Sequence, residues 1–323
     1  MQRKLYILSG ILSVLILVNA FFIFSFPDSG GESSVSRTST ENTDRSGRVE
    51  PSLNNSQAYI FPISESSYLP TLNTAVEKPL LAAKSAVIYD TRSSRFLYSK
   101  NPDTRLPIAS LTKLLTGVVV LENLNPEDIV QVSKESVKVD SEKQTLFLDE
   151  NIKVKDLMKM MLIESSNDAA YALTQHASGL GYNFLDLMNK KAVELGMNNS
   201  IFHDPAGLND DASSTSEDLV KLVKYSFKFD EIWSILSEKN IVVYSVDGKI
   251  AHQINSTNQL LGVIPDVVGG KTGYTDIALG NMILAVDVPG EDDRIISIVL
   301  GSTERFTDTQ KLIDWVKKAY SWK

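Results

Sequence analysis

The sequence predicts an α+β fold, in which an antiparallel β-sheet is covered by helices and carries a helical subdomain. Short β-branched runs open the folded part of the chain, and helical periodicity fills its middle. Longer β-branched runs and one more helical segment close it. Because strands lie at both ends of this order, we expect the helical block to be an insertion between the first and last strands of one sheet.

The first segment, residues 5–26, is predicted to be a transmembrane anchor. The run is uncharged and mostly apolar, and as a helix it would be about 33 Å long, close to the thickness of a bilayer core. Arg3 and Lys4 precede it, so the rest of the chain is expected on the extracytoplasmic side of the cell membrane. Small residues at 18–20 leave a cleaved signal peptide as the alternative, and either interpretation exports the folded domain.

Residues 27–77 are predicted to be a flexible extracytoplasmic linker, because Ser, Thr, Asn and Gly dominate them and no apolar period is sustained. One short apolar patch at residues 59–63 is the exception and could pack against the folded domain. That domain is expected to occupy residues 78–323.

Composition excludes several classes of function. The net charge of −8 argues against a nucleic-acid binder, which usually carries a basic stripe. The chain contains no Cys, so disulfides, thiolate metal sites and cysteine nucleophiles are excluded. Its three His residues are well separated and show no metal-binding spacing, so we expect neither a metal nor a cofactor.

The folded part begins with a predicted hairpin, whose strand-like runs at 85–89 and 96–98 are separated by a turn signal at 92–95. From Ser110 the apolar residues recur at helical spacing as far as residue 121. Further helices are predicted at residues 153–164, 168–178, 184–195 and 218–227. Asp168 is the expected N-cap of the second of these, and Gly196 is expected to stop the third. Three strands and a terminal helix follow at residues 241–246, 281–288, 295–300 and 308–320.

The first candidate motif is Ser-Leu-Thr-Lys, residues 110–113, at the start of the first predicted helix. Residues i and i+3 share one helix face, so the Ser110 hydroxyl and the Lys113 amine can meet. Serine is a weak nucleophile without an adjacent base, and a lysine can be that base once burial or a neighbouring cation makes it neutral. The ordinary alternative is a surface lysine on an amphipathic helix.

The second candidate motif, Ser165-Ser166-Asn167, lies in the break between two predicted helices. A second hydroxyl, that of Ser165, could shuttle a proton, and the Asn167 amide could hold a substrate backbone. The ordinary alternative is a set of helix-capping groups.

The third candidate motif, Lys271-Thr272-Gly273, could bind a carboxylate while a strand edge approaches the substrate backbone. Gly-Lys-Thr also ends the phosphate-binding loop of nucleotide-binding proteins. That loop would need a glycine where Pro265 stands and a helix after it, whereas the residues that follow are strand-like. A phosphate loop is therefore rejected.

Taken in this order, Ser-x-x-Lys, Ser-x-Asn and Lys-Thr-Gly are the motifs of the penicillin-recognising serine hydrolases. The chain resembles the D-alanyl-D-alanine carboxypeptidases of the low-molecular-mass penicillin-binding class, serine peptidase family S11. The resemblance covers residues 81–320 and implies the β-lactamase/transpeptidase-like form of the predicted fold. Further blocks that resemble the family lie at residues 88–90, 97–98, 106–109, 168–170, 194–197, 204–208, 257–258 and 274–275.

The resemblance implies catalytic roles for matching positions. Ser110 would attack the carbonyl between two terminal D-alanines of a peptidoglycan stem peptide, and Lys113 would be its base. Ser165 would relay a proton to the departing D-alanine, with Lys271 in electrostatic support. The backbone N–H groups of Ser110 and Tyr274 would form the oxyanion hole. β-Lactam antibiotics would acylate the same serine.

The resemblance also implies a substrate-binding set. Asn167 would hold the acyl side of the substrate, Thr272 and Arg305 would bind its terminal carboxylate, and Gly273 belongs to the strand that lies along it. One position departs from the family pattern, because Leu279 stands where a glycine is usual after Lys-Thr-Gly. We expect this to alter strand packing without removing activity.

Two alternatives remain. A class A-like β-lactamase shares the motifs, but it needs a glutamate for its deacylating water. Glu194 has a suitable spacing to Asn198, although Gly196 between them favours an ordinary helix end. The other alternative is a catalytically silent cell-wall-binding domain.

Overall fold

The computed structural model describes residues 69–139, 144–288 and 293–322, all within one unit of the chain, residues 62–323. The predicted anchor and the apolar patch at 59–63 lie outside the described residues, as does the linker up to residue 68. None of the helices in the described part is both long and apolar enough to span a bilayer.

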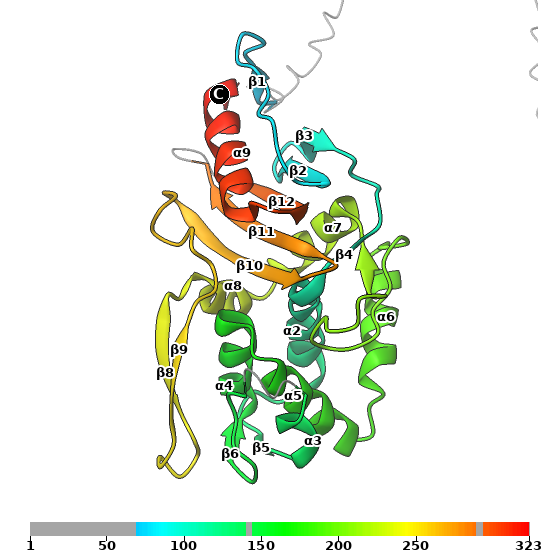
Figure 1. Cartoon of the computed structure of the whole chain (residues 1–323), viewed down its shortest axis with the longest axis vertical. Coiled ribbons are helices and arrows are strands. Elements are labelled where there is room, and N and C mark those ends of the chain that lie inside the picture. The colour runs from blue at the N-terminus through cyan, green and yellow to red at the C-terminus, as the bar shows by residue number, and fades with distance from the viewer. Residues whose placement is uncertain (1–68, 140–143, 289–292, 323) are drawn as a thin grey trace, which may run out of the picture. The chain divides into compact units, whose positions relative to one another are not determined.

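A five-stranded antiparallel sheet forms the centre of the described part (Figure 1). The strands run in the order β10-β11-β12-β2-β3, so β10 and β3 are the edges. Their bounds are Ser85–Asp90 for β2, Arg95–Lys100 for β3, Val267–Thr275 for β10, Leu279–Asp287 for β11 and Arg294–Ser302 for β12. Because β2 and β3 precede the block of helices from α2 to α8 and β10 to β12 follow it, the predicted α+β fold with a helical insertion is confirmed.

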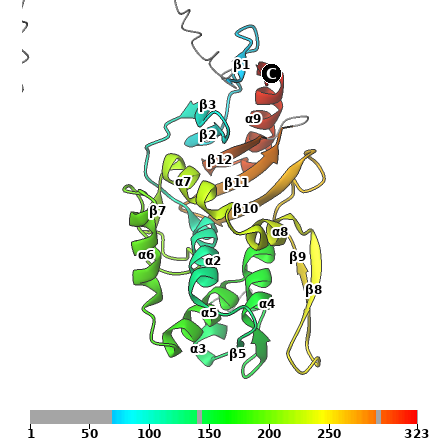
Figure 2. The ribbon, with the colours of Figure 1, turned by 180° about the vertical axis from the view of Figure 1, so that it is seen from behind.

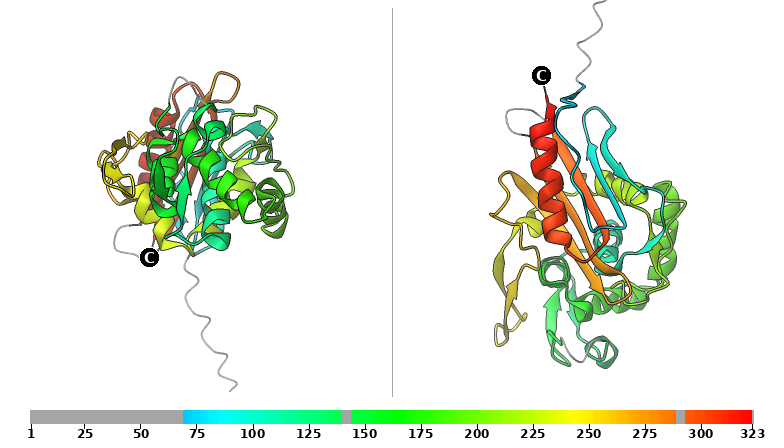
Figure 3. Two further views of the ribbon diagram at one scale, coloured as in Figure 1. Left: turned by 90° about the horizontal axis from the view of Figure 1, so that it is seen from below. Right: turned by 45° about the horizontal axis from the view of Figure 1, so that its top comes forward.

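Helices cover both faces of this sheet, which explains why its three inner strands, β11, β12 and β2, are buried at almost every position. On one face lies α9, Arg305–Ala319 (Figure 3). Its Trp315 packs in the same hydrophobic cluster as Ile88. The other face packs against the helical subdomain (Figure 2). Val87 and Ile298 of this face belong to the same hydrophobic cluster as that subdomain. Each fully buried aliphatic side chain stabilises the fold by about 1.5–3 kcal/mol, so the two clusters clamp the sheet from both sides.

The helical subdomain is built around α2, Thr112–Asn123, in which every residue from Thr112 to Val120 is buried. A helix that is covered on all sides belongs to the core and need not show a polar face. The helices packed around it or near it are α3 Lys134–Val137, α4 Val154–Lys159, the π-helix η2 Met160–Glu164, α5 Asn167–Gly179, α6 Phe184–Glu194, α7 Ser216–Ser226 and α8 Asp230–Ser237.

Four two-stranded ribbons complete the described part. They pair β1 Thr71–Leu72 with β13 Tyr320–Ser321, β4 Leu106–Pro107 with β7 Ser213–Ser214, β5 Ile129–Gln131 with β6 Asn151–Lys153, and β8 Asn240–Tyr244 with β9 Ala251–Asn255.

The predicted start of the folded domain at residue 78 is too late. Strand β1 pairs with β13, and the Asn73 N–H donates to the Ala319 carbonyl over 2.7 Å. Val76 packs against the cluster under α9. A two-residue strand carries no periodicity, so the sequence pattern could not reveal that the domain reaches back to Thr71.

The predicted N-cap of α5 is wrong. Ser166, not Asp168, precedes the helix, and its hydroxyl accepts the Ala169 N–H over 3.1 Å. Asp168 lies in the first turn, where its carboxylate accepts the N–H of Thr145 over 2.8 Å. The cap is set by which side chain reaches the first free N–H groups, and Ser166 is the nearer one.

Candidate active site

Ser110 lies in a single 3-10 turn, η1 Ala109–Leu111, between β4 and α2. Ala109 has a φ of 48°, in the left-handed region, so the backbone turns sharply just before the serine. Gly273 of β10 packs against this turn. A Cβ built on Gly273 would lie 2.8 Å from the Ile108 carbonyl oxygen and 3.1 Å from the Ser110 nitrogen. The edge strand therefore holds the third motif directly against the first.

Lys113 lies one turn after Ser110 and is fully buried. Its Nζ is 2.8 Å from Ser110 Oγ, 2.7 Å from Asn167 Oδ1 and 2.8 Å from the carbonyl oxygen of Ala206. Since Asn167 is the first residue of α5, the first and second motifs meet at one lysine nitrogen.

The second motif lies where the π-helix η2 gives way to α5. Ser165 has a φ of 69°, so the chain leaves the helical path at this residue. Ser165 Oγ accepts a hydrogen bond from Lys271 Nζ over 2.9 Å, whereas Ser166 caps α5 and Asn167 reaches Lys113. The change of helix type therefore lets three consecutive polar residues serve three different partners.

Lys271 lies on β10 and is 1% exposed. Its Nζ donates to Ser165 Oγ and, over 3.0 Å, to the carbonyl of Thr272. Burial lowers the pKa of Lys271 well below its ordinary value, and the positive charges of Lys113 and Arg305 lower it further. The charged form of the Lys271 amine is therefore disfavoured in this site.

The remaining predicted residues lie along β10 and at the start of α9. The Thr272 hydroxyl is 2.6 Å from that of Thr257, and Tyr274 is 57% exposed. The Arg305 guanidinium lies 5.8 Å from the centre of the Tyr274 ring. Burial lowers the pKa of Arg305. Arg305 Nε is buried and has no hydrogen-bond partner within the described residues.

The structure thus gathers the predicted residues into two hydrogen-bonded groups. Ser110, Lys113 and Asn167 form one, and Ser165 with Lys271 forms the other. Across the described ranges, no three His, Cys, Asp or Glu side chains are arranged to hold a metal ion.

Three contacts at the site have no predicted role. The Ala206 carbonyl binds Lys113, Asp204 organises the loop that carries this carbonyl, and Thr257 shares a hydrogen bond with Thr272. A backbone carbonyl leaves no signature in a sequence. The blocks at 204–208 and 257–258 were the only available signal, and they pointed to the family without indicating these contacts.

Glu194, the residue on which a β-lactamase would depend, is an ordinary helix end. Helix α6 ends at Glu194, and Gly196 follows with a φ of 70°. The Glu194 side chain is about half exposed and forms an ion pair of 2.8 Å with Lys191 on its own helix. The prediction of a helix terminus is confirmed.

Comparison with known proteins gives a consistent picture. The family of D-alanyl-D-alanine carboxypeptidases, Peptidase_S11, matches residues 72–304. The chain is 31% identical over 247 residues to the D-alanyl-D-alanine carboxypeptidase DacF of Bacillus subtilis. This alignment covers 74% of this chain and 63% of that protein. It is 38% identical over 206 residues to a D-alanyl-D-alanine endopeptidase of Haemophilus influenzae, covering 62% of this chain and 69% of that protein.

A solved structure agrees with these relatives. The DD-transpeptidase of Streptomyces K15 matches with a TM-score of 0.69 at 28% identity, over 74% of this chain and 98% of that one. The match of the family over most of the described residues, together with the three motifs at one site, shows that the chain belongs to the D-alanyl-D-alanine carboxypeptidase family S11 of serine peptidases.

Proposed function

We propose that the chain is a serine-type D-Ala-D-Ala carboxypeptidase, which removes the terminal D-alanine from peptidoglycan stem peptides through an acyl-enzyme on Ser110. The observation that carries this proposal is the buried Lys113 nitrogen, 2.8 Å from Ser110 Oγ. A serine next to a buried amine has the base that it needs to become a nucleophile.

The neighbours of Lys113 support proton transfer from Ser110 to Lys113. The Asn167 Oδ1 and the Ala206 carbonyl can only accept hydrogen bonds. A neutral lysine has two N–H donors, and these serve the two acceptors. Its lone pair is then directed at Ser110 Oγ and can take the hydroxyl proton as the oxygen attacks the substrate carbonyl carbon.

The proton must next reach the leaving amine. When the C–N bond of the tetrahedral intermediate breaks, Ser165 gives its hydroxyl proton to the D-alanine nitrogen and takes up the proton that Lys113 accepted from Ser110. Lys271 stabilises the Ser165 oxygen during this relay from 2.9 Å. The negative oxygen of the intermediate lies between the N–H groups of Ser110 and Tyr274, each of which contributes about 3–4 kcal/mol in comparable sites. Water then hydrolyses the ester.

The substrate carboxylate is assigned to Thr272 and Arg305. The buried Arg305 Nε lacks a hydrogen-bond partner within the described residues, and a carboxylate would supply one. Asn167 holds the acyl side, and the absence of a side chain at Gly273 lets β10 lie close to the turn that bears the nucleophile.

We further propose that residues 5–26 anchor the chain in the cell membrane with its catalytic domain on the extracytoplasmic side. The support is the length of the apolar run and the two basic residues before it. Membrane fractions of cells that express the full chain should contain it, and a variant without residues 1–26 should leave that fraction. A truncated variant that stays membrane-bound would disprove the anchor.

The central test is mass analysis of the intact chain after incubation with benzylpenicillin, followed by peptide mapping. We expect a stable adduct on Ser110. Rapid turnover without an adduct would instead indicate a β-lactamase, and neither an adduct nor turnover would indicate a silent binding domain.

An endopeptidase is the second candidate, because the Haemophilus influenzae relative of that name is 38% identical. Both activities would use the same residues and differ in what the site admits beyond Thr272. Release of D-alanine from a pentapeptide, but not cleavage of a cross-linked peptide dimer, would support the carboxypeptidase. The reverse result would support the endopeptidase.

A further inference from the structure

The segment from Asn198 to Asn209 runs from the surface between α6 and α7 to the base Lys113. Two carboxylates hold it, Asp218 near its beginning and Asp204 near its end. Both carboxylates are at least nine-tenths buried. The backbone that Asp204 organises contacts Lys113, whereas the backbone that Asp218 organises does not belong to the three motifs.

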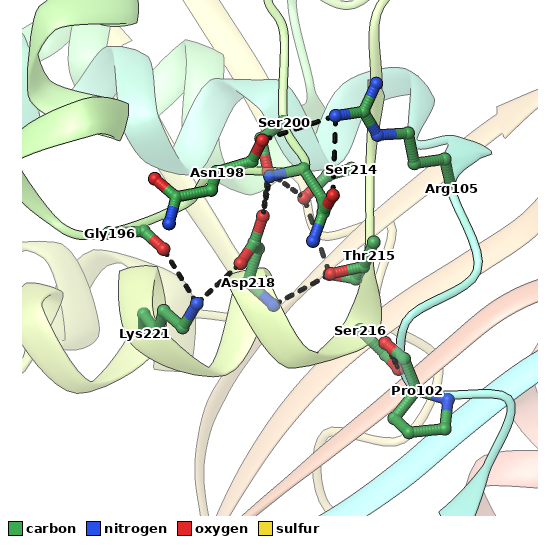
Figure 4. Close-up of polar contacts among 11 residues, drawn as sticks. Pro102, Arg105, Gly196, Asn198, Ser200, Ser214, Thr215, Ser216, Asp218 and Lys221 are labelled. Carbon is green, nitrogen blue, oxygen red and sulfur yellow. Dashed lines mark hydrogen bonds and ion pairs between the residues drawn. The ribbon is translucent and has the colours of Figure 1, made fainter.

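Asp218 fastens the beginning of the segment to α7 (Figure 4). Its carboxylate accepts the Asn199 N–H over 2.8 Å, the Ser200 hydroxyl over 2.9 Å and the Lys221 ammonium over 2.7 Å. The Ser200 hydroxyl also lies 2.7 Å from that of Ser214. These partners all lie outside the three motifs, so this end of the segment is a structural tie.

Asp204 gathers four successive backbone N–H groups. Its Oδ1 accepts those of Ala206, Gly207 and Leu208 over 2.7, 2.6 and 3.2 Å, and its Oδ2 accepts that of Asn209 over 2.7 Å. Four donors on one carboxylate fix the orientation of every peptide plane in this turn. The Ala206 carbonyl is thereby held 2.8 Å from Lys113 Nζ.

The turn also fits closely against its surroundings. The Thr116 hydroxyl of α2 donates to the Pro205 carbonyl over 2.7 Å. Gly207 has a φ of 75°, and a Cβ built on it would lie only 2.0 Å from the Ala109 carbonyl oxygen, beside the nucleophile. A change in the conformation of residues 204–209 would therefore displace both Lys113 and the turn η1 that carries Ser110.

We propose that Asp204 is a positioning residue for acylation: it fixes the Ala206 carbonyl and, through it, the direction in which the Lys113 nitrogen faces Ser110. This inference rests on the proposed role of Lys113 as the base. The carbonyl itself cannot be removed by substitution, which makes Asp204 the residue on which its role can be tested.

The test compares Asp204→Ala with Asp218→Ala in the full chain, by following the benzylpenicillin adduct over time and over a range of antibiotic concentrations. For Asp204→Ala we expect the acylation rate constant to fall about 100-fold, as for other small misplacements of a reacting group, with the non-covalent binding constant unchanged. The final adduct should still reach one per chain. Asp218→Ala should lower the unfolding temperature and keep the wild-type rate constant.

Asp204→Asn provides a second variant if the alanine variant does not fold. It keeps Oδ1 with its three N–H partners and alters only the contact with Asn209, so its rate constant should lie between those of the wild type and Asp204→Ala.

If the wild type forms the adduct, the proposed function stands, and three results with the variants would then overturn the proposal for Asp204. They are a wild-type rate constant in the Asp204 variants, an equal slowing in Asp218→Ala, or a loss of adduct in proportion to unfolded protein with no change of rate. A wild type that forms no adduct would instead refute the proposed function.

Discussion

The two Ser–Lys pairs of the site are built in different ways. Ser110 and Lys113 are three residues apart, and one turn of backbone brings their side chains to 2.8 Å. Ser165 and Lys271 are 106 residues apart and meet at 2.9 Å only because β10 lies beside the junction of η2 and α5. The first pair lies within one short stretch of chain, where η1 runs directly into α2. The second pair spans the contact between the helical subdomain and the sheet.

The difference indicates how each pair depends on the fold. A local pair persists while its helix persists. A pair between subdomains depends in addition on how β10 packs against the junction of η2 and α5. In our proposal the two pairs have different roles: the local pair attacks the substrate carbonyl, and the long-range pair delivers a proton to the leaving amine.

The largest expected effect comes from breaking the local pair. Ser110→Ala removes the nucleophile, so the penicillin adduct should disappear, a loss of at least about 10⁴-fold as for other nucleophiles of this kind. Circular dichroism and the unfolding temperature should stay close to wild type, because a small side chain is replaced by a smaller one. If this variant formed the adduct at the wild-type rate, Ser110 would not be the nucleophile.

Breaking the long-range pair should have a smaller effect on rate. Lys271→Met removes the amine that contacts Ser165, and acylation should slow by roughly 10²–10³-fold, within the range of general acid–base contributions. A rate close to wild type would show that the second pair takes no part in proton transfer.

The same variant should gain stability. Since the folded-state pKa of Lys271 lies well below that of a free lysine, the unfolded chain binds more protons between the two values, and wild-type stability rises with pH through that window. Lys271→Met should therefore be more stable near neutral pH, by about 1–2 kcal/mol. The advantage should shrink as the pH rises toward the ordinary lysine pKa, which urea denaturation at several pH values would measure. An advantage that grows with pH would contradict this account.

The contact between the two pairs can be loosened by Gly273→Ala. The added methyl would meet the Ile108 carbonyl and push β10 away from η1, so we expect acylation to slow by about 10–100-fold. Gly269→Ala is the matched control, because it lies on the same strand but faces Leu236 of α8. The control should change stability and not rate, and equal slowing in both variants would show that the strand as a whole is responsible.

Much of this arrangement could be predicted from sequence because it depends on local patterns. Helical spacing placed Lys113 beside Ser110, and the order of strands and helices indicated the insertion in the sheet. The short elements were missed: α8 has eight residues, and β9 carries little apolar alternation.

Contacts between distant segments could not be predicted in this way. The resemblance to a family predicts that Ser165 and Lys271 act together, whereas their spacing in the sequence alone does not. Neither approach could show that Asp204 directs a carbonyl at Lys113, because that contact depends on backbone orientation and not on residue type.

The smallest expected effect concerns Leu279, the departure from the family pattern. Leu279 opens β11 opposite Thr275 and has a φ of 58°, in the region that favours glycine. Its side chain contributes some apolar burial, so Leu279→Gly alone would mix two effects. Leu279→Ala loses the same burial and keeps the Cβ, and the comparison of the two variants isolates the backbone. We expect the glycine variant to be more stable by about 1 kcal/mol, the reverse of the usual order within a strand. Denaturant unfolding measures the difference, and a more stable alanine variant would show that the turn into β11 stores no strain. Acylation should be equal in both, because the strain lies beyond the strand residues that contact the two pairs.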